Sequence, residues 1–290
     1  MQIYPRRRII INADDFGLSR SVNQAIIDVY NKGNLTSTTL LVNMPGTEDA
    51  IQQAKSNPDL AVGLHFCLTE GKPLTICKSL TQPDGAFLSR PNLVQKLYSG
   101  KVNPQDIRTE FEAQIDRFCS YGLKLSHVDS HQHILMLPRL LDPVLPLILE
   151  NQLPIRVVRP PTIPWSLLVS RPTKFGKQLL NRILSKRLLR SCAGKTNEFL
   201  VSIHDLTSQD DLNPNTYRQL VSTVPRESTV ELMVHPYLLD DELRQYYDKV
   251  WSSKASFIHT CVQEYKALTQ ERLFSSNSLT RFREIALSNV

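Results

Sequence analysis

The chain has 290 residues, of which 41% are hydrophobic, enough for one large domain with a sizeable core. Its formal net charge is +6, but the excess is confined to residues 6–8 and 171–195, and no nucleic-acid recognition motif accompanies these patches. The cysteines are odd in number and lack C-x-x-C spacing. That count argues against a disulfide framework or a structural zinc site and fits a reducing cytoplasm. We therefore expect a cytoplasmic protein that does not bind nucleic acid.

Strand and helix patterns alternate from the start of the chain. Strands are predicted, in chain order, at residues 9–11, 35–42, 60–66, 125–129, 155–158, 199–203 and 230–234. Helices are predicted between them at 19–33, 47–56, 104–122, 139–150, 214–223 and 256–268. The first helix has Ser19 or Ser21 as its cap, and Pro143 and Pro146 must shorten or kink the fourth. No signal peptide and no bilayer-spanning run is indicated.

Repeated strand–helix units predict a mostly parallel sheet. The number of candidate strands is enough for a closed or nearly closed barrel. We therefore predict a single α/β domain over residues 1–290, folded as a distorted (β/α) barrel rather than an open doubly wound sheet. No G-x-G-x-x-G motif or P-loop follows the first strand, which removes the usual support for nucleotide binding.

Polar residues suited to catalysis fall at the carboxyl ends of the predicted strands, where (β/α) barrels assemble their active sites. Five separate segments contribute: Asp14 with Asp15, His65, the run Asp129, His131 and His133, Arg159, and His235. Each segment alone has a bland explanation, because an Asp-Asp pair is usually a cap or turn and a lone histidine is usually a satisfied polar residue. Agreement among the segments favours a shared site.

The run from Asp129 to His133 indicates metal or catalytic chemistry most directly. Residues two apart in an extended segment project to the same side, so its carboxylate and two imidazoles are expected to face one site. Such a set suits zinc or another divalent ion with a position open for water, which becomes a nucleophile near neutral pH. A second carboxylate can take the proton from that water. Asp14 and Asp15 offer this division of labour if the chain turns there, as Gly17 allows.

These residues lie within segments that resemble the YdjC-like carbohydrate deacetylases, the family that includes ChbG and the hopanoid-associated HpnK proteins. The matching segments occur in family order over most of residues 9–240: INADDFGLSRSVNQAI (11–26), LTSTTLLVN (35–43), AVGLHFCLTEGKPL (61–74), SHVDSHQHILMLP (126–138), IRVVRPP (155–161) and ELMVHP (231–236).

The resemblance implies a deacetylase-like (β/α) barrel and one divalent metal ion, magnesium or zinc. It implies that Asp15, His65 and His131 are the metal ligands and that Asp14 is the general base. The implied reaction is removal of an acetyl group from an N-acetylated sugar, either chitooligosaccharide-like or lipid-linked. Relatives also suggest a homodimer.

Further positions have implied roles around this centre. His235 matches the acid for the leaving amine, and Arg159 matches a basic residue that orients a catalytic carboxylate. Asp129 and His133 match positions that suit a hydrogen bond to a ligand histidine or a substrate contact. Many relatives have a small residue after the His-Pro pair, whereas Tyr237 follows here, where it would reshape the substrate edge or stack on a sugar ring.

A basic amphipathic insertion around residues 162–200 follows no family pattern. Residues 171–195 carry eight Lys or Arg and no Asp or Glu, interleaved with apolar residues at helical spacing. Two interpretations stay open. The segment is either a barrel helix with its apolar side on the core or a surface helix that touches an anionic membrane.

Two other function classes remain as alternatives. The same ligands serve other metal-dependent amidohydrolases and phosphoesterases, which a comparison of acetate and phosphate release distinguishes. A non-catalytic sugar- or lipid-binding protein is the second alternative, and it need not retain a stoichiometric divalent ion. The presence of ligands, base and candidate acid together favours the enzyme.

Overall fold

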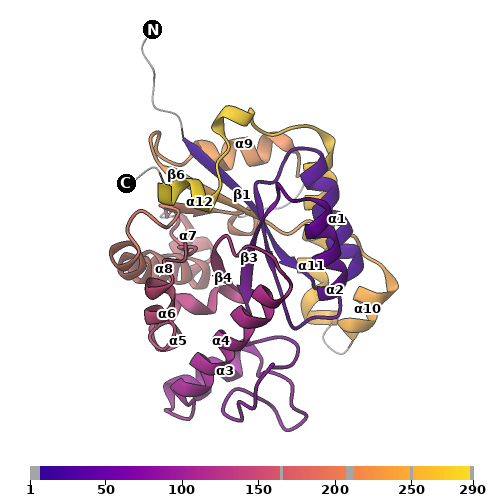
Figure 1. Cartoon of the computed structure of the whole chain (residues 1–290). Helices are drawn as coiled ribbons and strands as arrows, with labels where there is room; N and C mark the ends of the chain where they lie inside the picture. The colour runs from indigo at the N-terminus through magenta and orange to yellow at the C-terminus, as the bar shows by residue number, and fades with distance from the viewer. Residues whose placement is uncertain (1–6, 164–165, 207–211, 249–250, 288–290) are drawn as a thin grey trace.

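The structure, a computed structural model, describes residues 7–163, 166–206, 212–248 and 251–287 (Figure 1). Its frame is a six-stranded sheet in the order β4-β3-β2-β1-β6-β5, in which every pairing is parallel. The strands are β1 (Arg8–Phe16), β2 (Ser37–Leu40), β3 (Ala61–Phe66), β4 (Val128–Ser130), β5 (Phe199–Val201) and β6 (Thr229–Val234). This curled parallel sheet with its surrounding helices confirms the predicted α/β, barrel-like fold.

The strand expected at residues 155–158 is an irregular segment that joins the two edge strands of the sheet. On the β4 side, the backbone N–H of Arg156 donates to the carbonyl of Val128 at 3.0 Å. Toward β5, the Asn197 side chain accepts from the N–H of Val157 at 2.7 Å and donates to its carbonyl at 2.8 Å. Because a side-chain amide occupies these backbone positions, the segment continues the curl of the sheet without a strand ladder.

Helices surround the sheet, with α1, α2 and α11 on one side and α7 and α8 on the other (Figure 1). The longer helices are α1 (Arg20–Asn31), α2 (Thr47–Ser56), α3 (Arg90–Tyr98), α4 (Pro104–Ser120), α8 (Pro172–Ser191), α9 (Pro214–Ser222) and α11 (Trp251–Gln270). The shorter ones are α5 (Pro138–Leu141), α6 (Leu145–Glu150), α7 (Ser166–Ser170), α10 (Asp241–Tyr246) and α12 (Phe282–Leu287). None of the helices in the described ranges has the length and apolar composition needed to cross a membrane.

Several element boundaries follow from local sequence signals. The Ser19 hydroxyl accepts a hydrogen bond from the N–H of Val22 at 3.2 Å, so Ser19 rather than Ser21 caps α1. Pro143 lies in the break between α5 and α6, and Pro146 lies in the first turn of α6, where proline is tolerated. The helices α3, α7, α10 and α12 are not among the predicted elements, because they lie in segments without a clear apolar period.

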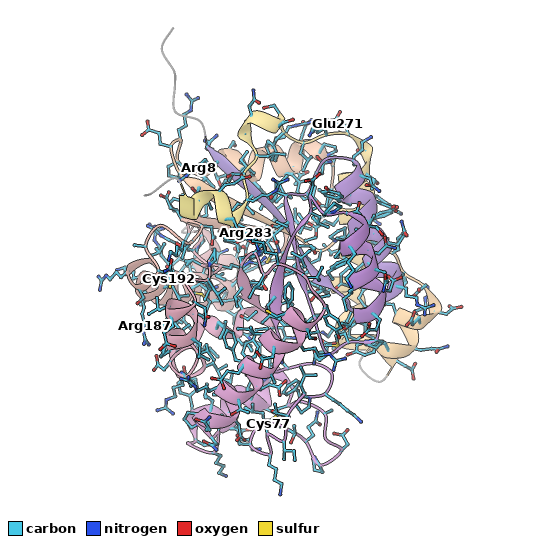
Figure 2. The ribbon with its side chains drawn as sticks, viewed as in Figure 1. Arg8, Cys77, Arg187, Cys192, Glu271 and Arg283 are labelled. Carbon is cyan, nitrogen blue, oxygen red and sulfur yellow. The ribbon has the colours of Figure 1, made fainter. Side chains whose placement is uncertain are left out.

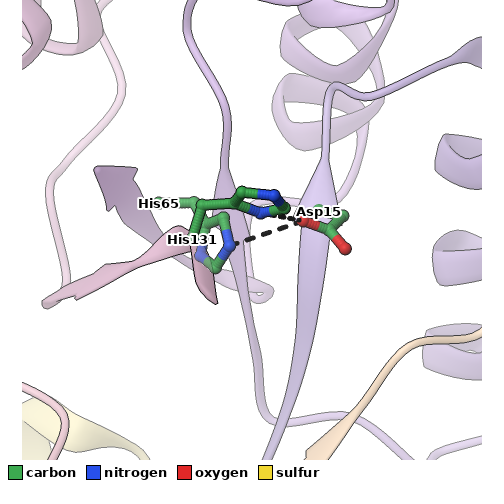
Figure 3. A group of neighbouring side chains, drawn as sticks. All are labelled: Asp15, His65 and His131. Atoms are coloured by element: carbon green, nitrogen blue, oxygen red, sulfur yellow. Dashed lines mark hydrogen bonds and ion pairs between the residues drawn. The ribbon is translucent and has the colours of Figure 1, made fainter. Parts of the chain in front are cut away.

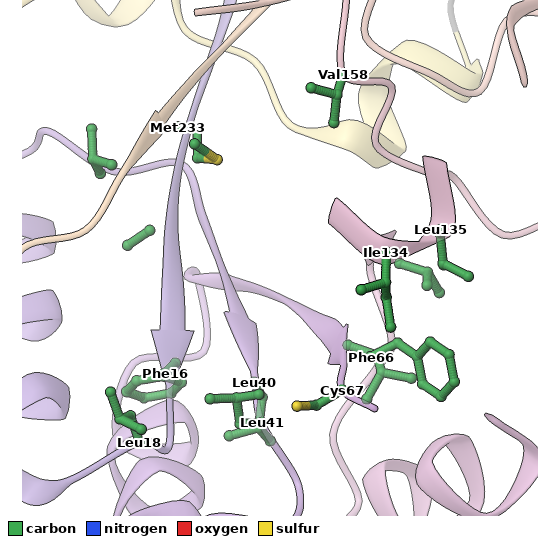
Figure 4. Packing of buried hydrophobic residues seen from close by; sticks show 14 of the residues in the cluster. Phe16, Leu18, Leu40, Leu41, Phe66, Cys67, Ile134, Leu135, Val158 and Met233 are labelled. Carbon is green, nitrogen blue, oxygen red and sulfur yellow. The ribbon is translucent and has the colours of Figure 1, made fainter. Parts of the chain in front are cut away.

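The outer face of the sheet packs against the helices in the main hydrophobic core. Alternate residues of β1, Ile9, Ile11 and Ala13, belong to this core. Figure 4 shows Phe16 from β1 and Phe66 from β3 in the same cluster. Burial of this continuous apolar layer, at about 25 cal/mol per Å², is the main stabilising contribution to the fold.

An apolar cluster closes the amino-terminal end of the inner face of the curled sheet. There Ile10 packs with Phe282 and Ile285 of α12. The His127 ring stacks on Phe282 with centroids 4.1 Å apart, and a Cβ at Gly63 would lie 2.6 Å from that imidazole. Helix α12 therefore closes this end, and the polar residues of the inner face are left to the carboxyl end of the strands.

Helix α8 occupies the basic segment, as predicted, but few of its apolar residues face the core. Its buried side chains are Gln178, Ser185 and Leu188. Leu180 and Ile183 keep 49% and 53% of their surface exposed. The expectation that the apolar side of this helix packs on the core is therefore met only in part.

Candidate active site

The chain turns at the end of β1, where Asp14 and Asp15 are adjacent. Asp15 has a φ of 67°, and the pairing of β1 with β2 shifts register between Ala13 and Phe16. A positive φ is uncommon outside glycine, although aspartate adopts it more readily than most residues. This β-bulge breaks the alternation of the strand, so both carboxylates enter the same site. The turn expected at this position is present.

Asp15, His65 and His131 lie together at the carboxyl ends of β1, β3 and β4 (Figure 3). Oδ1 of Asp15 is 3.4 Å from Nε2 of His65 and 3.1 Å from Nδ1 of His131. All three side chains are buried, and their ligand atoms lie within 4.8 Å of one another. A carboxylate and two imidazoles match the donors that bind Zn²⁺ and similar divalent ions and leave coordination positions open. We call these residues the first cluster.

Two side chains outside the first cluster hold its members in place. Nδ1 of His65 is 2.6 Å from Oδ1 of Asp129. The Tyr237 hydroxyl donates to Oδ2 of Asp15 at 2.6 Å. Tyr237 is only 1% exposed, so the expectation of a sugar-stacking surface at this residue is wrong. Asp129 therefore fixes the orientation of the His65 ring, and Tyr237 fixes that of the Asp15 carboxylate.

Glu70 is a site residue that the sequence pattern does not indicate. Its Oε2 is 3.0 Å from Nε2 of His131 and 3.4 Å from Nζ of Lys254. Glu70 lies in the loop after β3 rather than at a strand end, so only its place within the family-like segment 61–74 could have drawn attention to it.

The extended run expected after β4 ends at Ser130. His131 begins a 3-10 segment in which Gln132 and His133 have φ values of 53° and 56°. This left-handed backbone breaks the alternation of side chains. The prediction that one ligand site is faced by Asp129, His131 and His133 together is therefore wrong. His133 lines the pocket instead, with Nδ1 lacking a hydrogen-bond partner in the described part of the chain.

The arginine that binds Asp14 is Arg156, and the prediction of that role for Arg159 is wrong. Nη1 and Nη2 of Arg156 donate to the two oxygens of Asp14 at 2.7 and 2.6 Å, and Nη1 lies 2.6 Å from Oδ2 of Asp129. The irregular path of residues 155–158 instead places the guanidinium of Arg159 4.7 Å from the ring centroid of Phe199. Burial acts to raise the pKa of Asp14, but Arg156, together with His65 and His235, outweighs burial and holds that pKa well below its usual range.

The carboxylates around the two histidines make the site strongly attractive to positive charge. Burial acts to lower the pKa of both imidazoles. Asp129, together with Asp15 and Asp14, outweighs burial at His65 and raises its pKa to about 10. Asp15 and Glu70 have the same effect at His131 and raise its pKa to about 9. A divalent ion would satisfy the same excess of negative charge that holds these protons.

A pocket of about 520 Å³ opens over the first cluster and is large enough for a small ligand. Its floor includes His235, whose Nε2 is 3.8 Å from Oδ2 of Asp14 and whose pKa is lowered by burial. Helices α3, α8 and α11 supply the walls through Arg90, Lys177, Gln178, Asn181, Lys254 and Phe257. Reactive groups therefore lie at the bottom of the pocket and mixed polar and aromatic groups at its sides.

A family model described as YdjC-like protein matches residues 8–276. The chain belongs to the YdjC-like family. A relative named carbohydrate deacetylase from Clostridium beijerinckii is 30% identical over 267 residues, covering 92% of this chain and 93% of the relative. One of the same name from Brevibacillus brevis is 35% identical over 236 residues, covering 81% and 83%.

This YdjC-like chain is also similar in three-dimensional structure to a solved protein. It is a protein from Enterococcus faecalis described as a candidate cellobiose-phosphate cleavage protein. It is 25% identical, covers 97% of this chain and 99% of its own, and superposes with a TM-score of 0.73. The family resemblance inferred from the sequence is confirmed.

Proposed function

We propose that this YdjC-like protein is a metal-dependent deacetylase that removes an acetyl group from an N-acetylated sugar. The observation that carries the proposal is the first cluster at the bottom of a pocket, with Asp14 and His235 on its floor. The relatives named carbohydrate deacetylase support the same chemistry.

Asp15, His65 and His131 would hold one divalent ion, either magnesium or zinc. The fit rests on the donor set and on the surplus of buried carboxylates that surrounds both imidazoles. When bound, the ion supplies positive charge that polarises the substrate carbonyl and favours attack by water. Asp129 and Tyr237 keep the ligands oriented before the substrate arrives.

Asp14 and His235 divide the proton transfers of the reaction. Asp14 accepts a proton from the water that attacks the acetyl carbon, and the two hydrogen bonds from Arg156 keep it ionised and oriented. The C–N bond then breaks, and the proton taken up by Asp14 passes through His235, whose Nε2 is 3.8 Å from Oδ2 of Asp14, to the departing nitrogen. The products are acetate and a free amino sugar, so one water is consumed for each amide cleaved.

The pocket walls suit a sugar. Lys177 and Asn181 of α8 and Arg90 of α3 present groups that can bond to hydroxyl and carbonyl oxygens. The Phe257 ring of α11 offers an aromatic surface for the apolar face of a pyranose. These features support a carbohydrate ligand, while a free chitooligosaccharide and a lipid-linked amino sugar share the chemistry that they recognise.

An acetate-release screen tests the proposal. Metal-loaded protein is offered N-acetylglucosamine, chitooligosaccharides and acetylated glycolipids, with phosphate release from sugar phosphates measured in parallel. Asp14→Asn is expected to lower kcat by at least ~100-fold while the ion stays bound, because the proton acceptor is lost. The matched control is Asp84→Asn on an exposed loop. Phosphate release without acetate release, or near-normal turnover by Asp14→Asn, would contradict the assignment.

We also propose that the surface of α7 and α8 contacts anionic lipid. Val169 is 88% exposed and Ile183 is 53% exposed, on a segment rich in lysine and arginine. Arg187 of α8 lies at the periphery of the molecule (Figure 2) and pairs with Asp142. The predicted homodimer and cytoplasmic location stay predictions.

Co-sedimentation with vesicles of phosphatidylglycerol and phosphatidylcholine tests this surface, with pure phosphatidylcholine vesicles for comparison. Binding is expected only to the anionic vesicles and is expected to weaken with salt. Ile183→Glu should reduce binding several-fold. The matched control is Ile76→Glu, because Ile76 is 90% exposed on a loop away from these helices. Absence of binding at low salt would end the membrane proposal and leave the deacetylase proposal intact.

A further inference from the structure

A second group of metal-ligating side chains lies in the same pocket. His204 follows β5, His235 follows β6, and Glu264 belongs to α11. Their ligand atoms lie within 4.8 Å of one another, and both histidines line the pocket. We call these residues the second cluster. The role proposed above for the pocket uses His235 alone and leaves His204 and Glu264 without a function.

Each member of the second cluster has a buried polar atom without a hydrogen bond in the described residues. These atoms are Nε2 of His204, Nδ1 of His235 and Oε2 of Glu264; the buried Tyr217 hydroxyl, which also lacks a partner, lies beside Glu264. Buried polar atoms in proteins are nearly always hydrogen-bonded, and leaving one unpaired costs about 1–3 kcal/mol. These three unpaired atoms belong to residues that converge from separate elements. Their arrangement indicates a binding position for a cation that all three atoms can coordinate.

The second cluster is held in place although these atoms are unpaired. The other oxygen of Glu264, Oε1, accepts from the backbone N–H of His235 at 2.8 Å and is 3.7 Å from Nε2 of His204. The Phe257 ring contacts both imidazoles, stacked on His204 with centroids 4.9 Å apart and edge-on to His235 at 5.4 Å. The three side chains are therefore already close together inside the protein before they bind an ion.

We propose that His204, His235 and Glu264 form a second divalent-cation site, of the zinc type, where the two histidines line the pocket. Two imidazoles and a carboxylate repeat the donor set of the first cluster and suit zinc better than magnesium. Ligand atoms around one zinc ion lie ~3.4 Å apart, so side-chain shifts of roughly 1 Å bring the present atoms to bonding distance. The inference goes beyond the proposed deacetylation, which needs only one ion.

A cation at the second cluster would also define the proton position on His235. Its Nδ1 is the unpaired atom, whereas its Nε2 faces Asp14 at 3.8 Å. When a metal occupies one nitrogen of a neutral imidazole, the proton must reside on the other. The bound ion would therefore keep on Nε2 an N–H that is directed as a hydrogen-bond donor toward Asp14.

Metal stoichiometry of the intact protein tests the second site without reference to activity. Protein equilibrated with Zn²⁺ is desalted and analysed by inductively coupled plasma mass spectrometry, with affinities from calorimetry. Wild-type protein is expected to retain two ions per chain. His204→Ala and Glu264→Gln should each retain one, and the Glu264→Gln amide oxygen can still accept from the His235 N–H. Asp15→Asn should also retain one, because asparagine tolerates the left-handed backbone of that position.

The matched control is His259→Ala, an exposed histidine on the same helix as Glu264, which should retain both ions. Circular dichroism before analysis shows whether each variant is folded. One ion in wild-type protein, lost completely in Asp15→Asn and kept in His204→Ala, would overturn the second site and leave the first intact. One ion lost in His204→Ala and kept in Asp15→Asn would instead overturn the metal assignment on which the proposed function rests.

Discussion

The two ligand clusters share a pocket and a donor set, but they differ in how their atoms are supported. In the first cluster, His65 is bonded to Asp129, Asp15 to the Tyr237 hydroxyl, and His131 to Glu70. The second cluster has unpaired buried atoms on all three of its residues. The first is therefore oriented by the protein itself, whereas the second would gain most of its polar partners from a bound ion.

The two clusters therefore differ in whether their ligand geometry exists before an ion binds or depends on the bound ion. Ligands held by hydrogen bonds keep their geometry whether or not an ion is present, and the energetic cost of that order is met during folding. In the first cluster, the supporting network extends to Arg156, which contacts Asp14, Asp129 and Glu231 at 2.6 Å each. Among the residues that the structure describes, no arginine or lysine pairs with the Glu264 carboxylate in this way, although Nζ of Lys174 donates to the backbone carbonyl of His204 at 3.0 Å.

The largest expected effect comes from removing the centre of that network. Arg156→Ala leaves three buried carboxylates without their cation and should lower the free energy of unfolding by about 3–5 kcal/mol. His204→Ala should cost about 1 kcal/mol or less, because its unpaired nitrogen makes no hydrogen bond to lose. Urea denaturation of ion-free protein measures both values.

Arg159→Ala is the control for loss of an arginine, with an expected cost of about 0.5–1 kcal/mol for its contact with Phe199. If Arg156→Ala does not fold, Arg156→Lys keeps the charge but loses the paired hydrogen bonds to Asp14. That variant should fold and lose about 100-fold in kcat, because the base is misoriented. Equal destabilisation by Arg156→Ala and His204→Ala would contradict the claim that only the first cluster is held by a stabilising hydrogen-bond network.

A smaller effect, of up to about 100-fold per pH unit, is expected in zinc affinity at the first cluster. The pKa values of His65 and His131 are raised to about 10 and about 9, so near pH 7 both imidazoles carry a proton that an ion must displace. Affinity should therefore rise with pH, steeply below the pKa of His131 and less steeply between the two pKa values. Calorimetry of His204→Ala in buffers of different ionisation enthalpy counts the protons released.

The second cluster should show a shallower dependence on pH. Burial lowers the pKa of His235, so near pH 7 this imidazole mostly lacks its second proton, and an ion that binds it displaces fewer protons than at the first cluster. Asp15→Asn protein isolates this cluster for the same calorimetric measurement. The same slope in both variants would show that the carboxylates around the first cluster do not control its protons.

Strand ends were the most useful guide to the site before the structure was known. Asp14, Asp15, His65 and His235 were placed at the carboxyl ends of predicted strands, and parallel strands bring such ends to one edge. Their shared location therefore needed only the periodicity of the sequence and a family-like set of segments. The six-stranded parallel sheet and its family membership agree with that prediction.

The strand-end prediction fails where the expected strand is absent and for residues of loops. The sequence pattern predicts the carboxylate-binding role for Arg159, whereas Arg156 is the residue that binds Asp14, because residues 155–158 follow an irregular path that strand alternation does not describe. Glu70 and His204 lie in loop or 3-10 segments without a repeating period. The role of Tyr237 depends on its burial behind Asp15, which no local pattern specifies.

The amino-acid sequence by itself determined the order of strands and helices, the parallel sheet and the edge at which the chemistry lies. These features depend on apolar periods and turn signals that act over a few residues. Tertiary structure alone decided which arginine binds Asp14, which partners hold each ligand, and that His204 and Glu264 meet His235. The physical reason is that hydrogen bonds between distant segments depend on backbone bulges and curvature, which arise only when the whole sheet is assembled.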